Sequence, residues 1–474
     1  MRNSIQTGLS LSLFLFTLGG CSKKFLQLSP YDQVSLEQSI VDENSMQTAV
    51  NGMYASLRAT DFLGRSLPVD GDLMADNTYI SPQNSNRYLQ EFTYSYAPAN
   101  FSDGRNTWME IYNTILSANS VINANIPGDA KSNQLRGEAL TVRALSYFEL
   151  IKFFALPYLQ DSTAPGVPLV LQYNPQLTPP RNTVAEVYSQ IETDLVQAYG
   201  LMTTTKNSSY VTKYVAQSLL ARMYLFKGEW SSALTSAQDV VMNGGYSLTP
   251  AQFLQNYWSN PFPVANGVET IFEVEFDQIN NNGTDDLDAI YDQNGYGDIL
   301  CTDDLYSIYS STDARLGLIE AGNRAGTTVW VVNKYPNLSN ANGKDNTKVI
   351  RYAEVLLTLA EAYNRIGGND LAARTYLNQV ADARDTAFTG YTDSGPQLLN
   401  DIISERRKEL AFEGQRYWDL VRLGQPVIRN NSSGNYSLVP PADLTLPALD
   451  IRRIFPIPQA EMNANKNMKQ NPGY

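Results

Sequence analysis

The fold is decided by the stretch Leu220-Ala221-Arg-Met-Tyr224-Leu-Phe-Lys-Gly228-Glu-Trp230-Ser-Ser-Ala233-Leu-Thr-Ser-Ala237-Gln-Asp-Val240. Small residues recur where two antiparallel helices must approach each other, and aromatic residues recur where the space between them must be filled. A glycine stands between the two helical segments, where the chain must turn. These offsets are those of a tetratricopeptide-type helical pair.

A second copy of this pattern begins at Leu359-Ala360-x-x-Tyr363, with Gly367 in the place of Gly228. A weaker copy, Arg143-Ala144-x-x-Tyr147, lies in a helix predicted over 137–154. Its partner helix is predicted over 184–199, because the chain between the two is rich in proline, which interrupts helices. The sequence therefore contains an internal helical repeat.

The repeats lie much farther apart than the ~34 residues of a regular tandem array, so long insertions must separate them. The larger insertion, at about 246–348, is rich in Asn, Gly and Asp and contains a strand-like run over 270–276. A second irregular stretch runs from about 60 to 101. We therefore predict an all-α scaffold of tetratricopeptide-like helical pairs, within about 30–245 and 349–425, with long irregular loop insertions that contain minor β structure.

Charge and composition exclude several functions. The 474 residues include 35 Lys and Arg against 48 Asp and Glu, a formal net charge of -13. Such an acidic chain lacks the basic surface that binds a phosphate backbone, so we expect no nucleic-acid partner. Histidine is absent, which excludes His-based triads and His-ligated zinc.

The first twenty residues have the pattern of an export signal. Arg2 precedes an apolar run over 9–18, which is too short to span a bilayer core roughly 30 Å thick as a helix. The run ends in Leu18-Gly19-Gly20-Cys21, which resembles a bacterial lipobox. We predict that residues 1–20 are removed, that Cys21 is lipidated, and that residues 21–474 form one body held to a membrane only by the lipid anchor.

The loop insertions contain the residues that we expect to bind a ligand. Flat aromatic rings beside carboxylate, amide and guanidinium groups suit a sugar, because ring C–H groups pack on the aromatic face and planar polar groups bridge hydroxyls. The expected contacts are Trp258, Trp330, Tyr291, Tyr296, Asp298, Asp72, Arg87 and Tyr88. The alternative is that these aromatic residues only fix the long loops to the frame.

The acidic residues of the insertion suggest two weaker alternatives. Asp285-Asp286, Asp288 and Asp303-Asp304 offer paired carboxylates of the kind a glycosidase uses. The segment from Asp292 to Asp303 partly resembles a calcium loop, but Tyr296 occupies a ligand position. We expect no catalysis, no cofactor and no metal.

The alternating charges over 404–422 follow helical spacing and predict a structural ion-pair network.

The order of several motifs resembles the SusD/RagB family of outer-membrane lipoproteins over nearly the whole mature chain. These motifs are Val50-Asn51-Gly52-Met53-Tyr54, Gly137-Glu-Ala-Leu-x-x-Arg143-Ala-x-x-Tyr147-Phe148, Arg351-Tyr-Ala-Glu354, Glu405-Arg406 through Glu413-Gly414-x-Arg416-x-Trp418-Asp419-Leu420, Phe455-Pro456-Ile457-Pro458 and Gln470-Asn471-Pro472-Gly473-Tyr474. They describe the scaffold and assign no binding residue.

The resemblance implies four tetratricopeptide-like pairs and an exposed position at the cell surface, on a TonB-dependent transporter barrel. It implies capture of glycan, or alternatively of peptide. The competing interpretation of the sequence is a helical-repeat scaffold that binds only protein. Family members often carry acidic residues just after the lipidated cysteine, whereas Lys23 and Lys24 stand here.

Overall fold

The computed structural model describes residues 39–174, 176–265 and 267–474. The predicted signal segment, Cys21, Lys23 and Lys24 lie outside these ranges. Within them, no helix is both long enough and apolar enough to cross a membrane.

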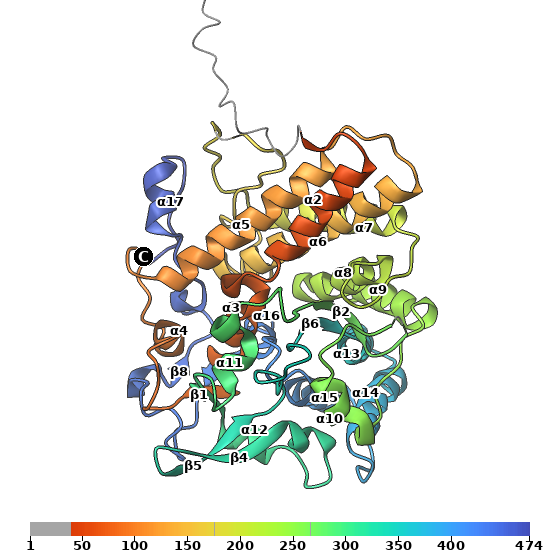
Figure 1. The fold of residues 1–474 in the computed structure, drawn as a ribbon. Coiled ribbons are helices and arrows are strands. Elements are labelled where there is room, and N and C mark those ends of the chain that lie inside the picture. Colours follow the sequence, from red (N-terminus) through yellow and green to blue (C-terminus); the bar gives the residue numbers. More distant parts are fainter. Residues whose placement is uncertain (1–38, 175, 266) are drawn as a thin grey trace, which may run out of the picture.

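Antiparallel helical pairs form the frame of the molecule (Figure 1). The pairs are α2 (Glu43–Ser56) with α5 (Ser102–Ile122), α6 (Ala130–Phe154) with α7 (Val184–Leu201), α8 (Lys213–Lys227) with α9 (Trp230–Asn243), and α13 (Tyr352–Ile366) with α14 (Asp370–Arg384). Neighbouring pairs also pack on one another, α5 on α6, α7 on α8 and α9 on α13. The all-α tetratricopeptide-like scaffold predicted from the sequence is confirmed, including both strong repeats and the delayed partner helix α7.

Local sequence explains where these helices begin and end. Asp129 and Ser132 form a reciprocal capping box at the start of α6, which satisfies backbone N–H groups that the first turn leaves free. Gly228 ends α8 with a φ of 72°, a conformation that disfavours residues with a Cβ. The small residues Ala233 and Ala237 are fully buried, as close helix packing requires.

Strands and short helices lie in the insertions and in the C-terminal segment after α15 (Gly395–Glu409). Strand β2 (Thr270–Val274) pairs with β6 (Thr347–Arg351), and β7 (Val427–Ile428) pairs with β8 (Thr445–Leu446), both antiparallel. A further sheet has the order β1 (Thr78–Ile80), β3 (Ile299–Cys301), β5 (Thr327–Val332) and β4 (Ile319–Arg324). The short helices are α3 (Ser66–Leu73), α4 (Leu89–Thr93), α10 (Leu254–Ser259), α11 (Leu287–Tyr291), α12 (Asp303–Ser307), α16 (Arg416–Arg422) and α17 (Gln459–Ala464).

The stretch over 60–101 is more ordered than the sequence predicts. Helix α3 is buried along its whole length although it contains Pro68, Asp70 and Asp72. Periodicity could not find this helix, because both its apolar and its polar positions face protein. Val69 and Leu73 of α3 join a second hydrophobic cluster, which is built mainly from the two insertions, whereas Leu67 packs in the core of the helical pairs.

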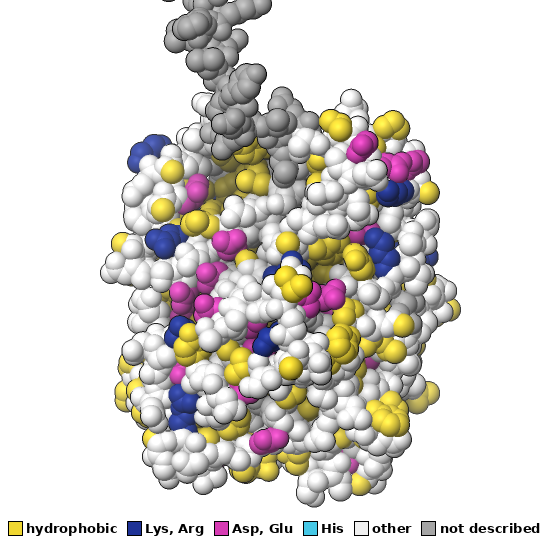
Figure 2. All heavy atoms as spheres, in the orientation of Figure 1, with side chains coloured by type: hydrophobic (Ala, Val, Ile, Leu, Met, Phe, Trp, Pro, Cys, Tyr) yellow, Lys and Arg dark blue, Asp and Glu magenta, His cyan; other side chains and the backbone are white. Residues whose placement is uncertain are grey.

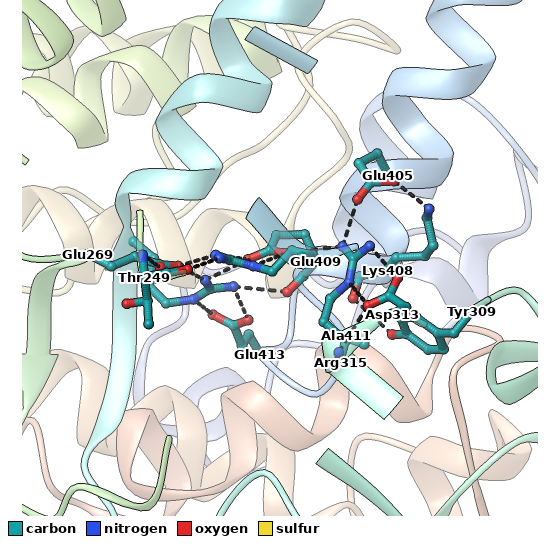
Figure 3. Close-up of polar contacts among 12 residues, drawn as sticks. Thr249, Glu269, Tyr309, Asp313, Arg315, Glu405, Lys408, Glu409, Ala411 and Glu413 are labelled. Carbon is teal, nitrogen blue, oxygen red and sulfur yellow. Dashed lines mark hydrogen bonds and ion pairs between the residues drawn. The ribbon is translucent and has the colours of Figure 1, made fainter. Parts of the chain in front are cut away.

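A network of buried ion pairs joins the C-terminal part of the frame to the larger insertion (Figure 3). It is centred on Glu405 and Glu409 of α15 (Gly395–Glu409) and on Glu413, which follows that helix. The ion pairs within it are Arg315 with Asp313, Glu405 and Glu409, Arg351 with Glu269, Glu409 and Glu413, Arg384 with Glu269 and Glu409, Lys334 with Glu413, and Lys408 with Glu405. Each carboxylate faces a cation, which confirms the structural interpretation of this charged segment.

Candidate functional site

The sheet β1-β3-β5-β4 positions a partly exposed aromatic pair that includes one of the predicted residues. Trp330 on β5 lies opposite Cys301 of β3 and Ala321 of β4. Its indole stacks on the ring of Tyr306 from α12, with the ring centroids 3.6 Å apart and the planes 8° apart. Both side chains are partly exposed. The two rings cover each other's inner faces and form one stacked, partly exposed aromatic pair.

Helix α12 fixes this aromatic pair in place. The hydroxyl of Thr302 caps the helix by accepting a hydrogen bond from the backbone N–H of Leu305. Asp303 and Tyr306 are three residues apart and therefore share a face of the helix. The indole Nε1 of Trp330 donates to Oδ1 of Asp303 at 3.0 Å. A carboxylate that also faces solvent thus lies at the edge of the aromatic surface, as recognition of a sugar hydroxyl requires.

A polar cluster surrounds Asp298, just before β3. The backbone N–H of Ser85 donates to both carboxylate oxygens at 3.1 Å, and its hydroxyl also donates to this carboxylate. Nη2 of Arg324 donates to Oδ1 at 3.1 Å. Asp298 is buried. The predicted residue therefore anchors the loop over 81–88 and orients Arg324.

Arg87 and Tyr296 meet at this loop. Nη2 of Arg87 donates to the hydroxyl of Tyr296 at 2.7 Å, and its guanidinium carbon lies 3.6 Å from the ring centroid. Such a contact between cation and ring holds a long side chain in one orientation. Arg324 lies three positions along β4 from Ala321, the partner of Trp330, a separation of roughly 10 Å along a strand. The sheet therefore carries both the aromatic pair and the polar cluster.

Trp258 and Tyr88 lie beneath the surface. Nζ of Lys334, Nζ of Lys348 and the guanidinium carbon of Arg351 lie 4.2, 4.8 and 5.2 Å from the ring centroid of Trp258. The hydroxyl of Tyr88 accepts from Nε of Arg65 at 2.8 Å. Both aromatic side chains are buried. A direct contact with ligand remains a prediction for them.

Tyr291 and Asp72 are also buried. Tyr291 stacks on Tyr335, with the centroids 5.8 Å apart. Asp72 accepts hydrogen bonds from Nδ2 of Asn77 at 2.7 Å and from the backbone N–H of Gly414 at 2.6 Å, and burial raises its pKa to about 6. Asp72 thus joins α3 to the turn after α15. Their role in binding likewise remains a prediction.

The acidic residues of the insertion are dispersed among several partners. Asp285 forms an ion pair with Arg65 at 2.7 Å. Asp292 accepts from the backbone and side-chain nitrogens of Asn294 at 2.7 and 3.0 Å, as in an Asx turn. Asp288 is buried and its pKa is raised to about 7, first by burial and then by neighbouring Asp345 and Asp286. Over residues 39–174, 176–265 and 267–474, no group of three or more Asp, Glu or Cys side chains is arranged to hold a metal ion.

Sequence reasoning missed Tyr306, Ser85 and Arg324. Tyr306 lies in a five-residue helix with no detectable periodicity, and its stacking partner comes from a different strand. The only local signal was its position three residues after Asp303. Ser85 and Arg324 meet Asp298 through contacts between residues distant in sequence, and such contacts leave no pattern in one chain.

Family comparisons agree with this architecture. Residues 306–474 match the model described as the SusD family, and residues 24–225 match a related model, described as starch-binding associating with outer membrane. The chain belongs to the SusD family. The family resemblance drawn from the sequence motifs is therefore confirmed.

Individual relatives cover nearly the whole SusD-family chain. SusD-like protein P2 of Formosa agariphila is 28% identical over 98% of this chain and 98% of its own length. A putative sugar binding protein from Bacteroides vulgatus is 29% identical, has a TM-score of 0.81, and is matched over 92% of this chain and 99% of that one. Surface glycan-binding protein A from Bacteroides thetaiotaomicron, solved in complex with laminarihexaose, shares the fold at 21% identity, with a TM-score of 0.70 over 91% of this chain and 100% of that one.

Proposed function

We propose that this SusD-family protein captures glycan at the cell surface without cleaving it and delivers it to a TonB-dependent outer-membrane transporter. One observation carries the proposal: Trp330 and Tyr306 form a stacked, partly exposed pair with Asp303 bonded at its edge. A flat aromatic surface beside a carboxylate provides the two interactions that a sugar ring offers, C–H packing and hydroxyl hydrogen bonding.

Each site residue has a distinct role in this proposal. The sugar packs on an outer face of the stacked Trp330 and Tyr306 pair, and Asp303 orients the indole. Arg87 and Tyr296 form the polar side of the site, and the buried Asp298 anchors the loop that carries Arg87. The buried residues Trp258, Tyr291, Asp72 and Tyr88 support the loops that present it. This division follows burial, because only partly exposed groups reach a ligand without rearrangement.

The family comparisons support a carbohydrate ligand. One of the two matching family models describes starch binding, and a structural relative above 25% identity is described as sugar binding. Lipid attachment through Cys21, after removal of residues 1–20, would leave residues 21–474 as one body tethered at the outer membrane.

The glycan proposal is tested by affinity electrophoresis of the purified protein through gels containing a panel of polysaccharides. We expect at least one polysaccharide to retard the wild type, and Trp330→Ala and Tyr306→Ala to lose about 1–3 kcal/mol of affinity each. Tyr173→Ala is the matched control, because Tyr173 is an exposed aromatic residue far along the chain from the site. No retardation by any polysaccharide, or unchanged retardation of both variants, contradicts the proposal.

Two further measurements test the remaining parts of the proposal. Incubation with the same panel should release no reducing sugar, whereas release would indicate a glycosidase. A pull-down of the tagged lipoprotein from its native host in mild detergent should recover a TonB-dependent barrel in near-equal amount. Recovery of other proteins without a barrel, together with no glycan binding, would favour the helical interaction scaffold.

A further inference from the structure

A second recess lies where the helical frame meets the larger insertion, away from the sheet that carries Trp330. It has a volume of about 210 Å³. The end of α2, the chain at 209–210 and strand β2 with the residue that follows it line the recess. Figure 2 shows hydrophobic side chains set between basic and acidic ones near the middle of this face. The volume far exceeds the ~10–15 Å³ that one ordered water needs.

Two opposite charges line this recess without a partner. Arg58 and Glu275 both contribute to its wall. Among the described residues, no side chain or backbone group forms a hydrogen bond or ion pair with the guanidinium of Arg58 or the carboxylate of Glu275. Arg58 also helps to lower the pKa of Asp277, but hydrogen bonds from Asn280 are the larger cause. Both charged groups therefore keep their full hydrogen-bonding capacity.

Two other polar side chains of the recess, those of Glu273 and Tyr54, are already engaged. Glu273 is buried, accepts from the hydroxyl of Ser208, and lies 3.6 Å from Nζ of Lys348. The hydroxyl of Tyr54 donates to Glu138 at 2.8 Å and accepts from the backbone N–H of Val211 at 2.9 Å. These contacts hold the walls in place before any ligand arrives, which lowers the cost of ordering on binding.

Tyr210 closes the aromatic side of the recess. Its ring meets that of Tyr54 edge to face, with the centroids 5.6 Å apart, and Nζ of Lys206 lies 4.9 Å from its centroid. The residue is 37% exposed. It therefore offers a rigid apolar edge beside the two unpaired charges.

We propose that this recess binds a single neutral sugar ring, as a second subsite distinct from the Trp330 and Tyr306 pair; the proposal rests on the protein's proposed function as a glycan-binding protein. The unpaired Arg58 and Glu275 balance each other in charge, so a neutral ligand with hydroxyl donors and acceptors satisfies both. The volume is below the ~300–1,000 Å³ of pockets that enclose larger ligands, which limits the occupant to about one ring.

Saturation-transfer NMR on the full-length protein tests this proposal with free glucose, galactose, mannose, xylose and N-acetylglucosamine. Alanine serves as a zwitterionic probe and glutamate as an anionic one. We expect transfer to at least one sugar and to neither amino acid. The signal should persist in Trp330→Ala, and Arg58→Met combined with Glu275→Gln should weaken binding about tenfold or more, since each charged hydrogen bond contributes about 1.5–3 kcal/mol.

Arg105→Met is the matched control, because Arg105 is exposed on α5. It should leave the signal unchanged, and circular dichroism should show all variants folded. Transfer to no sugar, transfer to the amino acids alone, or a sugar signal in Trp330→Ala that survives the addition of Arg58→Met and Glu275→Gln overturns the second subsite. Loss of the signal in Trp330→Ala alone also overturns it, but leaves the proposed function intact. Failure of all glycan binding in both assays contradicts both proposals.

Discussion

Arg351 holds Glu413 in a bidentate ion pair. Nε of Arg351 donates to one carboxylate oxygen at 2.7 Å and Nη2 donates to the other at 2.6 Å. Arg351 is 1% exposed and Glu413 is 9% exposed. Arg351 ends β6, the strand that leads from the larger insertion into α13, and Glu413 follows α15. The pair therefore holds the end of the larger insertion against the segment that follows α15.

We predict that Glu413→Gln lowers the free energy of unfolding by about 3–5 kcal/mol, because it leaves the buried guanidinium of Arg351 without its full charge partner. Urea denaturation followed by circular dichroism measures this change. Glu43→Gln is the control, since Glu43 forms only a partly exposed ion pair with Lys131 at 3.6 Å and should have almost no effect. Equal effects of the two substitutions would show that the buried pair has no special role.

The same network predicts how stability depends on acid pH. Burial opposes ionisation of Glu413, but the charges of Arg351 and Lys334 outweigh it and hold its pKa below the usual value. A depressed folded pKa gives stability that is fully present above the unfolded pKa, about 4.3, and is lost as pH falls through the folded value. The free energy of unfolding should therefore fall below about pH 4.5. The fall should be shallower in Glu413→Gln, and an identical slope would contradict this account.

For Asp288 we predict the opposite pH dependence: its contribution to the free energy of unfolding should decrease as the pH rises. Its pKa is raised from 3.8 to about 7, and its carboxylate oxygens have no hydrogen-bond partner among the described residues. A raised folded pKa favours folding below the unfolded pKa, and this benefit is lost as pH rises towards 7. Asp288→Asn should therefore stabilise the protein at pH 8 by up to about 4 kcal/mol and have little effect at pH 4. Thermal unfolding at both pH values measures the difference, and destabilisation at pH 8 would contradict it.

Asp298 should control the order of the loop over 81–88. Asp298→Asn removes a charge that accepts hydrogen bonds from Ser85 and Arg324, each worth about 1.5–3 kcal/mol. Amide hydrogen exchange over 81–88 should become faster by about tenfold or more, since each 1.4 kcal/mol is a factor of ten. Asp292→Asn is the control, because Asp292 bonds only within its own turn. Unchanged exchange in Asp298→Asn would show that other contacts hold the loop.

The helical frame could be predicted from the sequence because its signals are local. The geometry of a helical pair requires a turn residue at Gly228 and a small residue at Ala233. The same two residue types recur with the same spacing at Gly367 and Ala372. Helix α3 could not be predicted from the sequence. Its polar residues Asp70 and Asp72 are buried by segments that are distant in the chain, so the helix shows no alternation of buried apolar and exposed polar positions.

The candidate site was predicted only in part. Among the residues that composition singled out, Trp330, Arg87, Tyr296 and Asp298 lie on one sheet or its adjoining loops. It could not separate the partly exposed Trp330 from the buried Trp258, because both stand in similar loop sequence. Their difference arises from the cations that cover Trp258, which come from Lys334 on the insertion and from β6.

A crystal structure with a bound oligosaccharide tests the central claim most directly. The oligosaccharide should be cut from whichever polysaccharide retards the protein. We predict that a sugar ring lies on the Trp330 and Tyr306 pair, with a hydroxyl within hydrogen-bonding distance of Asp303 or Arg87. An oligosaccharide bound elsewhere, with the aromatic pair bare, would contradict the proposed site.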